Sequence, residues 1–491
     1  MKKRIIEDSL LVQGSILAAA GLVTKLLGFL YRVPMANLLG EQGNGIYSVA
    51  FSIYNIALTL SSYSLPSAVS KLISERLGRG ERRGAERMYR TALIFALLGG
   101  LAAFAVLFFG ADYLEHVYRR DGLARPLRVL APTTLVVALL GVLRGWFQGR
   151  GNMVPTAVSQ IVEQVVNVVV SLLAAWQLLR LHGGAASWGA AGGTLGTLAG
   201  AAAAMLLMAV WVRRAGGRLT GLPARENAAP VWRPFLWTVV PMLLSQTVYQ
   251  LGATVDDLLF GRAMETKGVA DAVAASLQGV YNSQYNQLTT LPVAITTAMA
   301  ASLLPGIALY WSQGRRLEAM EKARTVIRLN MALAIPAAVG LAVLAEPIMT
   351  ELYPRLTDYR HLAVAMLELG SSAVVFYALS TITAAVLQGS GRVHTPARNA
   401  ALALGIHAVL VAALLYRTDL GVWALIVGNV TFPLTLALLN CRAVAALGCR
   451  WELRRTFLLP LAVSVPMGLI ALGVYHGLAA LGLRLSLSLL A

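Results

Sequence analysis

Residues 9–33 read SLLVQGSILAAAGLVTKLLGFLYRV, an apolar run that carries only Lys25 and Arg32 as charged residues. A helix rises about 1.5 Å per residue, so this run extends for roughly 37 Å and can cross the ~30 Å hydrocarbon core of a bilayer. Comparable runs of about 20 apolar residues recur along the chain. The sequence therefore predicts an all-α polytopic membrane protein.

Fourteen such runs can be placed, thirteen of them of full length. The last run contains Arg484 and rises only about 22 Å, which is less than the hydrocarbon core requires. The expected spans are residues 9–33, 45–68, 91–110, 127–147, 154–179, 187–212, 235–260, 279–305, 326–345, 363–387, 397–416, 420–441, 456–475 and 477–491.

The composition excludes the common soluble classes. Of the 491 residues, 57% are hydrophobic and 13% are charged, about half of the ~25% charged residues in soluble domains. The net charge is nonetheless +18, from 41 Lys and Arg against 23 Asp and Glu. A soluble enzyme, a disordered chain and a disulfide-rich secreted scaffold all fit poorly. Because the basic residues lie between apolar runs, membrane topology explains them better than nucleic-acid binding.

The placement of Lys and Arg predicts the orientation. Twenty-eight lie on the side of the N-terminus, 11 lie on the other side, and Lys25 and Arg32 lie inside the first span. Cytoplasmic loops carry such an excess, so we expect a multi-pass plasma-membrane protein with a cytoplasmic N-terminus. The basic segments 71–90 and 311–328 are expected to be amphipathic connectors on anionic membrane lipids, with a solvated loop as the alternative.

The chain also contains an internal repeat. Gly45-Ile-Tyr47 and Gly80 recur 234 residues later as Gly279-Val-Tyr281 and Gly314, and Gln148-Gly-Arg-Gly151 recurs 240 residues later as Gln388-Gly-Ser-Gly391. Six spans separate the copies, so both halves have the same orientation, as in transporters with a central cavity. The expected parts are an N-terminal lobe (1–213), a cytoplasmic linker (214–234), a C-terminal lobe (235–442) and C-terminal helices (443–491).

Charged residues at membrane depth are functional candidates, because each is costly to place there. Gly14, Gly21 and Gly28 form a stripe that lets a neighbouring helix approach closely. Lys25 and Arg32 lie on nearly the same face, about 10 Å apart along the helix axis. That separation suits an extended anion such as a diphosphate. The alternative is a pair of cations that snorkel to the interface.

Polar stripes on other spans favour a hydrated cavity, although hydrogen bonding between helices is the simpler interpretation of any single Gln or Asn. Asp256 and Asp257 point about 100° apart, so we expect one to face the cavity and the other to lie at the outer interface. The substrate-binding candidates are Lys25, Arg32, Tyr47, Tyr54, Asn55, Gln246, Tyr249, Gln250, Tyr281, Gln284 and Asn286. The candidates for ion coupling or a salt bridge are Glu163, Asp256, Asp257 and Glu368.

The sequence contains no motif that indicates an enzyme. It has neither a phosphate-binding P-loop nor a His-Glu-x-x-His zinc motif, and its six histidines are scattered. His407 lies in an apolar span and is either packed or lines a cavity. We expect no catalytic residues, no metal site and no cofactor beyond Na⁺ or H⁺ as a coupling ion.

Three N-terminal motifs carry a family resemblance: Lys25-Leu-Leu-Gly-Phe-Leu-Tyr-Arg-Val-Pro34, Gly43-Asn-Gly-Ile-Tyr47 and Ser61-Ser-Tyr-Ser-Leu-Pro66. Together with the Gln-Gly-x-Gly repeats, they resemble the stage V sporulation protein B-like polysaccharide exporters. That branch belongs to the MOP superfamily, which includes MurJ-type lipid II flippases. The resemblance implies two six-helix lobes, alternating access, and a diphosphate held by Lys25 and Arg32.

Two main functions follow from these observations. The first is a flippase that moves an undecaprenyl-diphosphate-linked cell-wall precursor, lipid II or a related polysaccharide unit, from the inner to the outer leaflet. The alternative is an H⁺- or Na⁺-coupled multidrug antiporter of the same superfamily. A non-transporting scaffold of wall synthesis is a third possibility. The expected partners are the lipid-diphosphate-linked saccharide, anionic lipids and cell-wall synthesis enzymes, but no nucleic acid.

Overall fold

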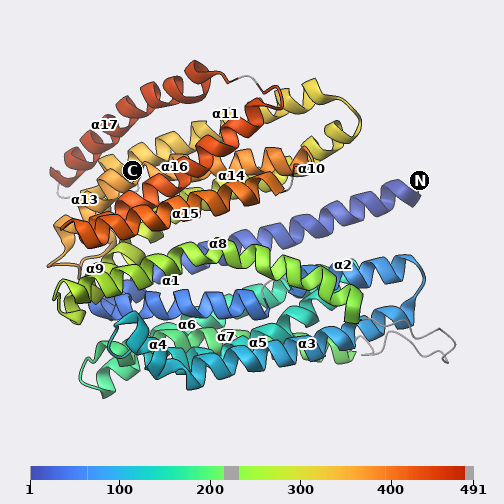
Figure 1. Cartoon of the computed structure of the whole chain (residues 1–491), viewed down its shortest axis with the longest axis horizontal. Helices are drawn as coiled ribbons and strands as arrows, with labels where there is room; N and C mark the ends of the chain where they lie inside the picture. The colour runs from blue at the N-terminus through green and yellow to red at the C-terminus, as the bar shows by residue number, and fades with distance from the viewer. Residues whose placement is uncertain (1, 63–64, 215–231, 393, 450, 481–491) are drawn as a thin grey trace. The chain divides into compact units, whose positions relative to one another are not determined.

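The computed structural model describes residues 2–62, 65–214, 232–392, 394–449 and 451–480. Within these ranges some side chains lie outside the description, chiefly those of residues 2–19, 25 and 240–253. All regular secondary structure of the described residues is helical (Figure 1). The chain forms two compact units, unit 1 (Met1–Asp257) and unit 2 (Leu258–Ala491), and each is described by itself. The expected lobe boundaries at 213 and 235 stay predictions.

The helices of each unit follow one another along the chain. Unit 1 contains α1 (Lys2–Ser61), α2 (Leu65–Gly78), α3 (Arg82–Phe109), α4 (Ala111–Tyr118), α5 (Ala124–Gly149), α6 (Val154–Leu181) and α7 (Ala186–Arg214), and α8 (Trp232–Thr266) continues into unit 2. Unit 2 contains α9 (Asp271–Gly279), the π-helix η1 (Val280–Tyr285), α10 (Asn286–Ser312), α11 (Arg316–Val343), α12 (Ala345–Leu352), α13 (Arg360–Gly370), α14 (Ala373–Gly389), α15 (His394–Arg417), α16 (Trp423–Ala445), the π-helix η2 (Arg454–Leu458) and α17 (Leu459–Ala480).

The predicted fold class is confirmed. In the described part of the chain, eight helices are long and apolar enough to cross a membrane, and the pair α13 and α14, bent by 42°, adds a ninth if it is one span. The predicted total of fourteen stays a prediction. Most of the short last span, 477–491, lies outside the described residues, as does most of the predicted linker.

Helix α1 consists of two arms that fold back on each other. Gly40, with φ 67° and ψ 179°, interrupts the helix. The Asn44 amide donates hydrogen bonds to the carbonyl oxygens of Ala36 and Gly40, at 2.8 and 2.7 Å, which holds the break. The hydroxyls of Tyr31 and Tyr47 lie 3.1 Å apart. Sixteen residues of straight helix would separate their Cα atoms by about 24 Å, so the first two predicted spans form a helical hairpin.

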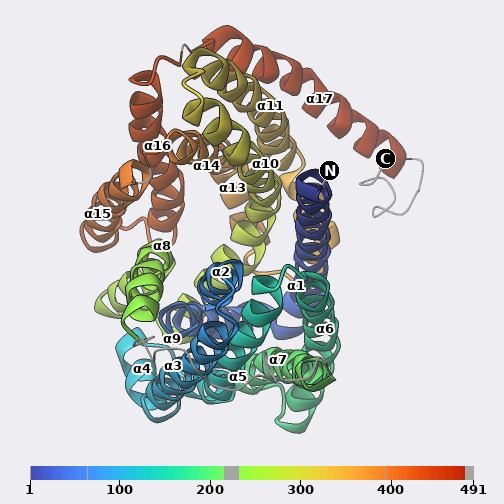
Figure 2. The ribbon, with the colours of Figure 1, turned by 90° about the vertical axis from the view of Figure 1, so that its right-hand side faces the viewer.

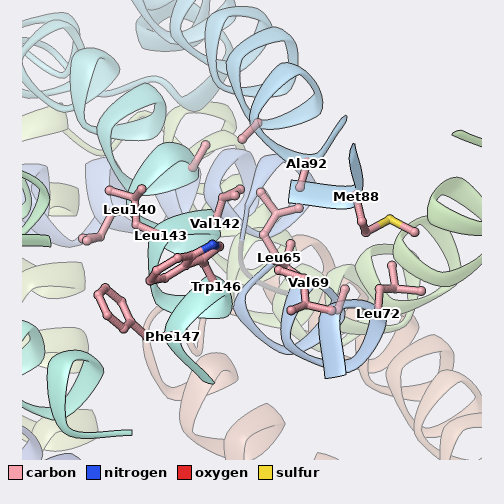
Figure 3. Packing of buried hydrophobic residues seen from close by; sticks show 14 of the residues in the cluster. Leu65, Val69, Leu72, Met88, Ala92, Leu140, Val142, Leu143, Trp146 and Phe147 are labelled. Atoms are coloured by element: carbon pink, nitrogen blue, oxygen red, sulfur yellow. The ribbon is translucent and has the colours of Figure 1, made fainter. Parts of the chain in front are cut away.

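The core of unit 1 lies between α2, α3, α5, α7 and α8. Figure 3 shows Leu65 and Val69 of α2 close to Trp146 of α5, which is fully buried. Seen from a second side, α3, α5 and α7 of this unit run side by side (Figure 2). Burial of apolar surface contributes about 25 cal/mol per Å² where it is removed from water, whereas close packing carries more of the stability at membrane depth.

Residues 71–90 and 311–328 do not form separate connectors, because they belong to the helices on either side of a turn. Their contact with anionic membrane lipids stays a prediction. Residues 71–78 end α2 and residues 82–90 begin α3, with Ile73 and Met88 in the core. In unit 2, residues 316–328 begin α11, and Ala323 and Ile327 are buried. The charges lie on one face of these helices, and apolar residues at helical spacing lie on the other. The many basic residues hid this apolar face from the composition-based prediction.

Two pairs of turns confirm the internal repeat at their positions. Gly80 and Gly314 have φ angles of 76° and 75°, and in both turns the glycine N–H donates to the carbonyl oxygen three residues earlier, at 3.0 and 3.1 Å. Gly151 and Gly391, with φ angles of 77° and 78°, make the corresponding bond at 2.9 and 3.1 Å. Since a Cβ atom disfavours positive φ, glycine suits all four corners.

Helices α6 and α7 approach each other along a stripe of glycines. A Cβ atom at Gly196 would lie 2.5 Å from the carbonyl oxygen of Asn167 and would overlap Ser171 Oγ. Cβ atoms at Gly192 and Gly200 would also collide with the backbone of α6. The close approach lets Ser171 Oγ donate a hydrogen bond of 2.7 Å to a backbone carbonyl of α7. Small residues therefore fix the distance between these two helices.

Candidate functional site

The central polar feature of unit 1 is an ion pair between α5 and α6. Arg144 Nη2 lies 2.6 Å from Glu163 Oε2, and Arg144 Nε donates to Ser159 Oγ at 2.9 Å. The two side chains are only 12% and 28% exposed. Ser159 and Glu163 are four residues apart and share one face of α6, so a single guanidinium reaches both. An ion pair on membrane-spanning helices is a functional candidate because of the cost of placing charges there.

Sequence reasoning missed Arg144, because the residue was counted with the cytoplasmic loop that follows the fourth span. It lies five residues before the end of α5, or about 8 Å along the helix. A long side chain at that position can turn back into the bundle. The nearest signal in the sequence was Glu163, whose charge inside a span calls for a cation from a neighbouring helix.

The first arm of α1 faces this part of α6. A Cβ atom at Gly28 would lie 3.3 Å from the Gln164 side chain, so the predicted close approach occurs at Gly28. Gly21, by contrast, has nothing within 4 Å of a Cβ position. Tyr54 of the second arm is buried and close enough to Glu163 for an electrostatic interaction. The two arms of α1 and the Arg144–Glu163 ion pair therefore form one polar region in unit 1.

The two predicted cations of the first arm are placed differently. Arg32 is exposed, and it interacts electrostatically with Tyr47, whose hydroxyl is hydrogen bonded to Tyr31. Lys25 lies on the same arm, but its side chain is outside the described residues. Asn55 is half-buried on the second arm. Arg32 of the first arm and Tyr47 of the second arm thus lie close together within unit 1. Their role in binding a substrate stays a prediction.

The candidates on α8 are described only in part. The side chains of Gln246, Tyr249 and Gln250 lie outside the described residues. Asp256 and Asp257 are both buried, 8% and 6% exposed, instead of being divided between a cavity and the outer interface. The sequence shows that Asp256 and Asp257 point to different faces of α8. Whether both faces are buried depends on which helices pack against α8.

In unit 2 the candidates gather at η1. Tyr281, Gln284 and Tyr285 lie in this π-helix and are buried. The Tyr285 hydroxyl lies 3.0 Å from the carbonyl oxygen of Gly370 and 2.9 Å from Asn429 Oδ1, and it donates its proton to one of them at a time. The Gly370 carbonyl ends α13, where a helix leaves carbonyls without partners. The Tyr285 hydroxyl thus caps the bent pair α13 and α14.

Three further candidates of unit 2 are Asn286, Glu368 and His407. Asn429 Nδ2 donates to Asn286 Oδ1 at 3.4 Å, which links a predicted site residue to Tyr285. Glu368, near the end of α13, is exposed. His407 is 4% exposed, and its ring N–H donates to the Gly428 carbonyl oxygen at 3.1 Å. His407 is therefore a packed histidine, the first of its two predicted alternatives.

Tyr285→Phe is expected to lower the unfolding temperature of the purified protein. The change leaves the Gly370 carbonyl and the Asn429 amide oxygen without their hydroxyl donor in a buried place, at a cost of about 1–3 kcal/mol. Thermal unfolding in detergent, followed by tryptophan fluorescence, measures the effect. Tyr416→Phe is the matched control, because that tyrosine is 46% exposed. Equal unfolding temperatures for both variants would contradict the prediction.

Comparison with known proteins agrees with this architecture. The family model described as polysaccharide biosynthesis protein matches residues 10–311, and the MatE model matches residues 241–413. Stage V sporulation protein B of Bacillus subtilis (strain 168) is 28% identical over 435 residues, 88% of this chain and 82% of that protein. The lipid II flippase MurJ of the same organism is 25% identical over 398 residues, 78% of this chain and 73% of that protein.

Solved structures show the same fold. An inward-facing multidrug resistance MATE family transporter of the MOP superfamily superposes with a TM-score of 0.73 at 16% identity, covering 89% of this chain and 99% of that one. Lipid II flippase MurJ in an inward closed conformation gives 0.69 at 14% identity, covering 93% and 92%. The chain is thus a multi-pass membrane protein with a transporter fold. Since the first family model matches more than half of its residues, the chain belongs to the polysaccharide biosynthesis protein family.

Proposed function

We propose that this protein is a flippase, and not an enzyme, that moves an undecaprenyl-diphosphate-linked cell-wall precursor from the inner to the outer leaflet of the plasma membrane. Lipid II or a related polysaccharide unit is the substrate class. The observation that carries the proposal is the pair of cations, Lys25 and Arg32, on an arm that contacts the polar face of α6. Cations inside a membrane span suit an anionic headgroup.

The relatives support this substrate class. Bacillus subtilis MurJ is named a lipid II flippase, and stage V sporulation protein B points to a role in sporulation. In the proposed mechanism the two halves alternate access across the membrane, with the N-terminus in the cytoplasm. Lys25 and Arg32 capture the diphosphate, while the tyrosines and amides of the second, seventh and eighth spans contact the sugars. The membrane potential, Na⁺ or H⁺ supplies the drive, and Asp256, Asp257 and Glu368 are the candidate ion-coupling acids.

A second candidate function is an ion-coupled multidrug antiporter. It is favoured by the MatE match over residues 241–413 and by the TM-score of 0.73 to a MATE transporter. An antiporter for cationic drugs needs an acidic binding surface, whereas the first arm presents two cations. The flippase is therefore the better supported of the two functions.

Reconstitution separates the two functions. The purified protein is placed in liposomes that contain fluorescently labelled lipid II, and a membrane-impermeant quencher reports the fraction in the outer leaflet over time. We expect translocation well above that of protein-free and heat-inactivated liposomes. Absence of lipid II movement, together with extrusion of a cationic dye driven by a Na⁺ or H⁺ gradient, would establish the antiporter instead.

A further inference from the structure

The Arg144–Glu163 pair is not fully enclosed by protein, and its hydrogen-bonding capacity is not used up. A guanidinium has five N–H donors, and the bonds to Ser159 and Glu163 use two of them. No nitrogen of Arg144 is a buried donor without a partner, and the Glu163 side chain is 28% exposed. Arg144 Nη1, which donates no hydrogen bond within the described part of the chain, is therefore not fully buried and has access to solvent or to a ligand. The carboxylate can also leave the pair without being trapped as an unpaired buried charge.

A second polar atom on the same helix lacks a partner. Gln160 Oε1 is buried and accepts no hydrogen bond from the described part of the chain. Gln160 precedes Glu163 by three residues, so the two lie on neighbouring positions of one α6 face. A buried acceptor without a donor costs about 1–3 kcal/mol, which a ligand with hydroxyl or amide donors would recover. Arg144 of α5 therefore supplies a guanidinium beside the α6 face that carries Glu163, and Gln160 of α6 supplies an acceptor without a donor.

Phosphate oxygens and a carboxylate bind a guanidinium with the same geometry, so they compete for Arg144. Arginine binds both in a bidentate manner, and a diphosphate brings more negative charge than one carboxylate. Glu163 is therefore an internal stand-in for an anionic ligand. When the ligand binds, the Glu163 side chain turns toward solvent, because the two negative groups repel each other.

We propose that Arg144 is a diphosphate-binding residue, and that Glu163 occupies it until the substrate displaces the carboxylate. The proposal rests on the proposed flippase function and extends it, because it adds an anion site outside the first arm. In the predicted orientation α5 ends at the cytoplasmic side. Arg144 then lies about 8 Å inside that end, near the level at which an inner-leaflet diphosphate enters. Gln160 accepts a hydrogen bond from the same substrate.

The test uses inorganic pyrophosphate as the probe and the purified full-length protein in detergent. Isothermal titration calorimetry gives its Kd for the wild type, Glu163→Gln, Arg144→Gln and the double variant. Removal of the competing charge is expected to tighten binding about tenfold in Glu163→Gln, in line with one charge-assisted hydrogen bond. Arg144→Gln is expected to weaken binding about tenfold. In the double variant the gain from Glu163→Gln should vanish, since the two residues act through one interaction.

Glu318→Gln is the matched control. It also removes the acid of an Arg–Glu pair, but both side chains of the Arg315–Glu318 pair are 49% exposed. The Kd of this variant should change less than twofold. If size-exclusion chromatography shows that Arg144→Gln is misfolded, Arg144→Lys replaces it. The lysine variant is expected to bind pyrophosphate more weakly than the wild type but still measurably. An unchanged Kd in Glu163→Gln, or a gain that persists without Arg144, would overturn the proposal.

The same variants in the lipid II translocation assay separate this site from the proposed function. If Glu163→Gln tightens pyrophosphate binding through Arg144 but the wild type moves no lipid II, the anion site is established and the flippase function fails. If the wild type moves lipid II but the Kd for pyrophosphate is the same in the Arg144 and Glu163 variants, the flippase function holds and the role of Arg144 fails.

Discussion

Gly196→Leu is expected to abolish the accumulation of folded protein in the membrane. A Cβ atom at this position would lie 2.5 Å from the Asn167 carbonyl oxygen and would overlap Ser171 Oγ. The leucine side chain extends further into α6, and a backbone cannot yield as a flexible side chain does. Overpacked cores typically lose ~1–3 kcal/mol through side-chain shifts, so separation of two helix backbones should cost more. The variant should aggregate or be degraded.

Fluorescence-detected size-exclusion chromatography of solubilised membranes measures the result, with the wild-type peak height as reference. The matched control is Gly405→Leu, because Gly405 also lies in a membrane-spanning helix, α15, but has nothing within 4 Å of its Cβ position. That variant should retain a peak close to wild type. A monodisperse, wild-type-like peak for Gly196→Leu would show that α6 and α7 separate readily and would contradict the packing argument.

Lys25→Ala is expected to abolish transport while the protein still reaches the membrane. The change removes one of the two cations proposed to hold the diphosphate. Hydrogen bonds to charged groups contribute about 1.5–3 kcal/mol, so the rate at low substrate concentration should fall by a factor of ten or more. Complementation of a flippase-depleted strain and lipid II movement in liposomes both report the loss.

Lys71→Ala serves as the control for Lys25, since Lys71 lies on α2 with 61% of its side chain exposed. Lys25→Arg should restore part of the activity, because it keeps the positive charge and can bind phosphate. Full complementation by Lys25→Ala at a normal protein level would remove the main support for the proposed diphosphate site.

Much of the architecture could be predicted from residues and spacing. The span at 154–179 matches α6 within two residues, because hydropathy reports directly which segments bury their backbone in a helix. The repeat was also visible, since Gly80 and Gly314 are needed wherever the same turn is made twice. The first two spans, 9–33 and 45–68, were placed on either side of Gly40, where the structure interrupts the helix.

The candidate site was predicted less completely. Tyr47, Tyr54 and Arg32 were named from their own helices. The structure places Arg32 near Tyr47 and Tyr54 near Glu163, while their role in binding stays a prediction. Glu163 was named as well, but its partner was not. Arg144 is 19 residues away on another helix, and no pattern within α5 or α6 shows which side chains meet.

The sequence by itself therefore determined the membrane class, the approximate positions of the spans, the repeat and the net charge pattern. Each of these follows from local quantities, namely the length of an apolar run, the spacing of residues on one helix, or a count of charges. Only the tertiary structure decided that one face of each basic segment packs into the core, that Asp256 and Asp257 are both buried, and that Arg144 pairs with Glu163. Those outcomes depend on distances between helices, which small residues such as Gly196 set through close packing.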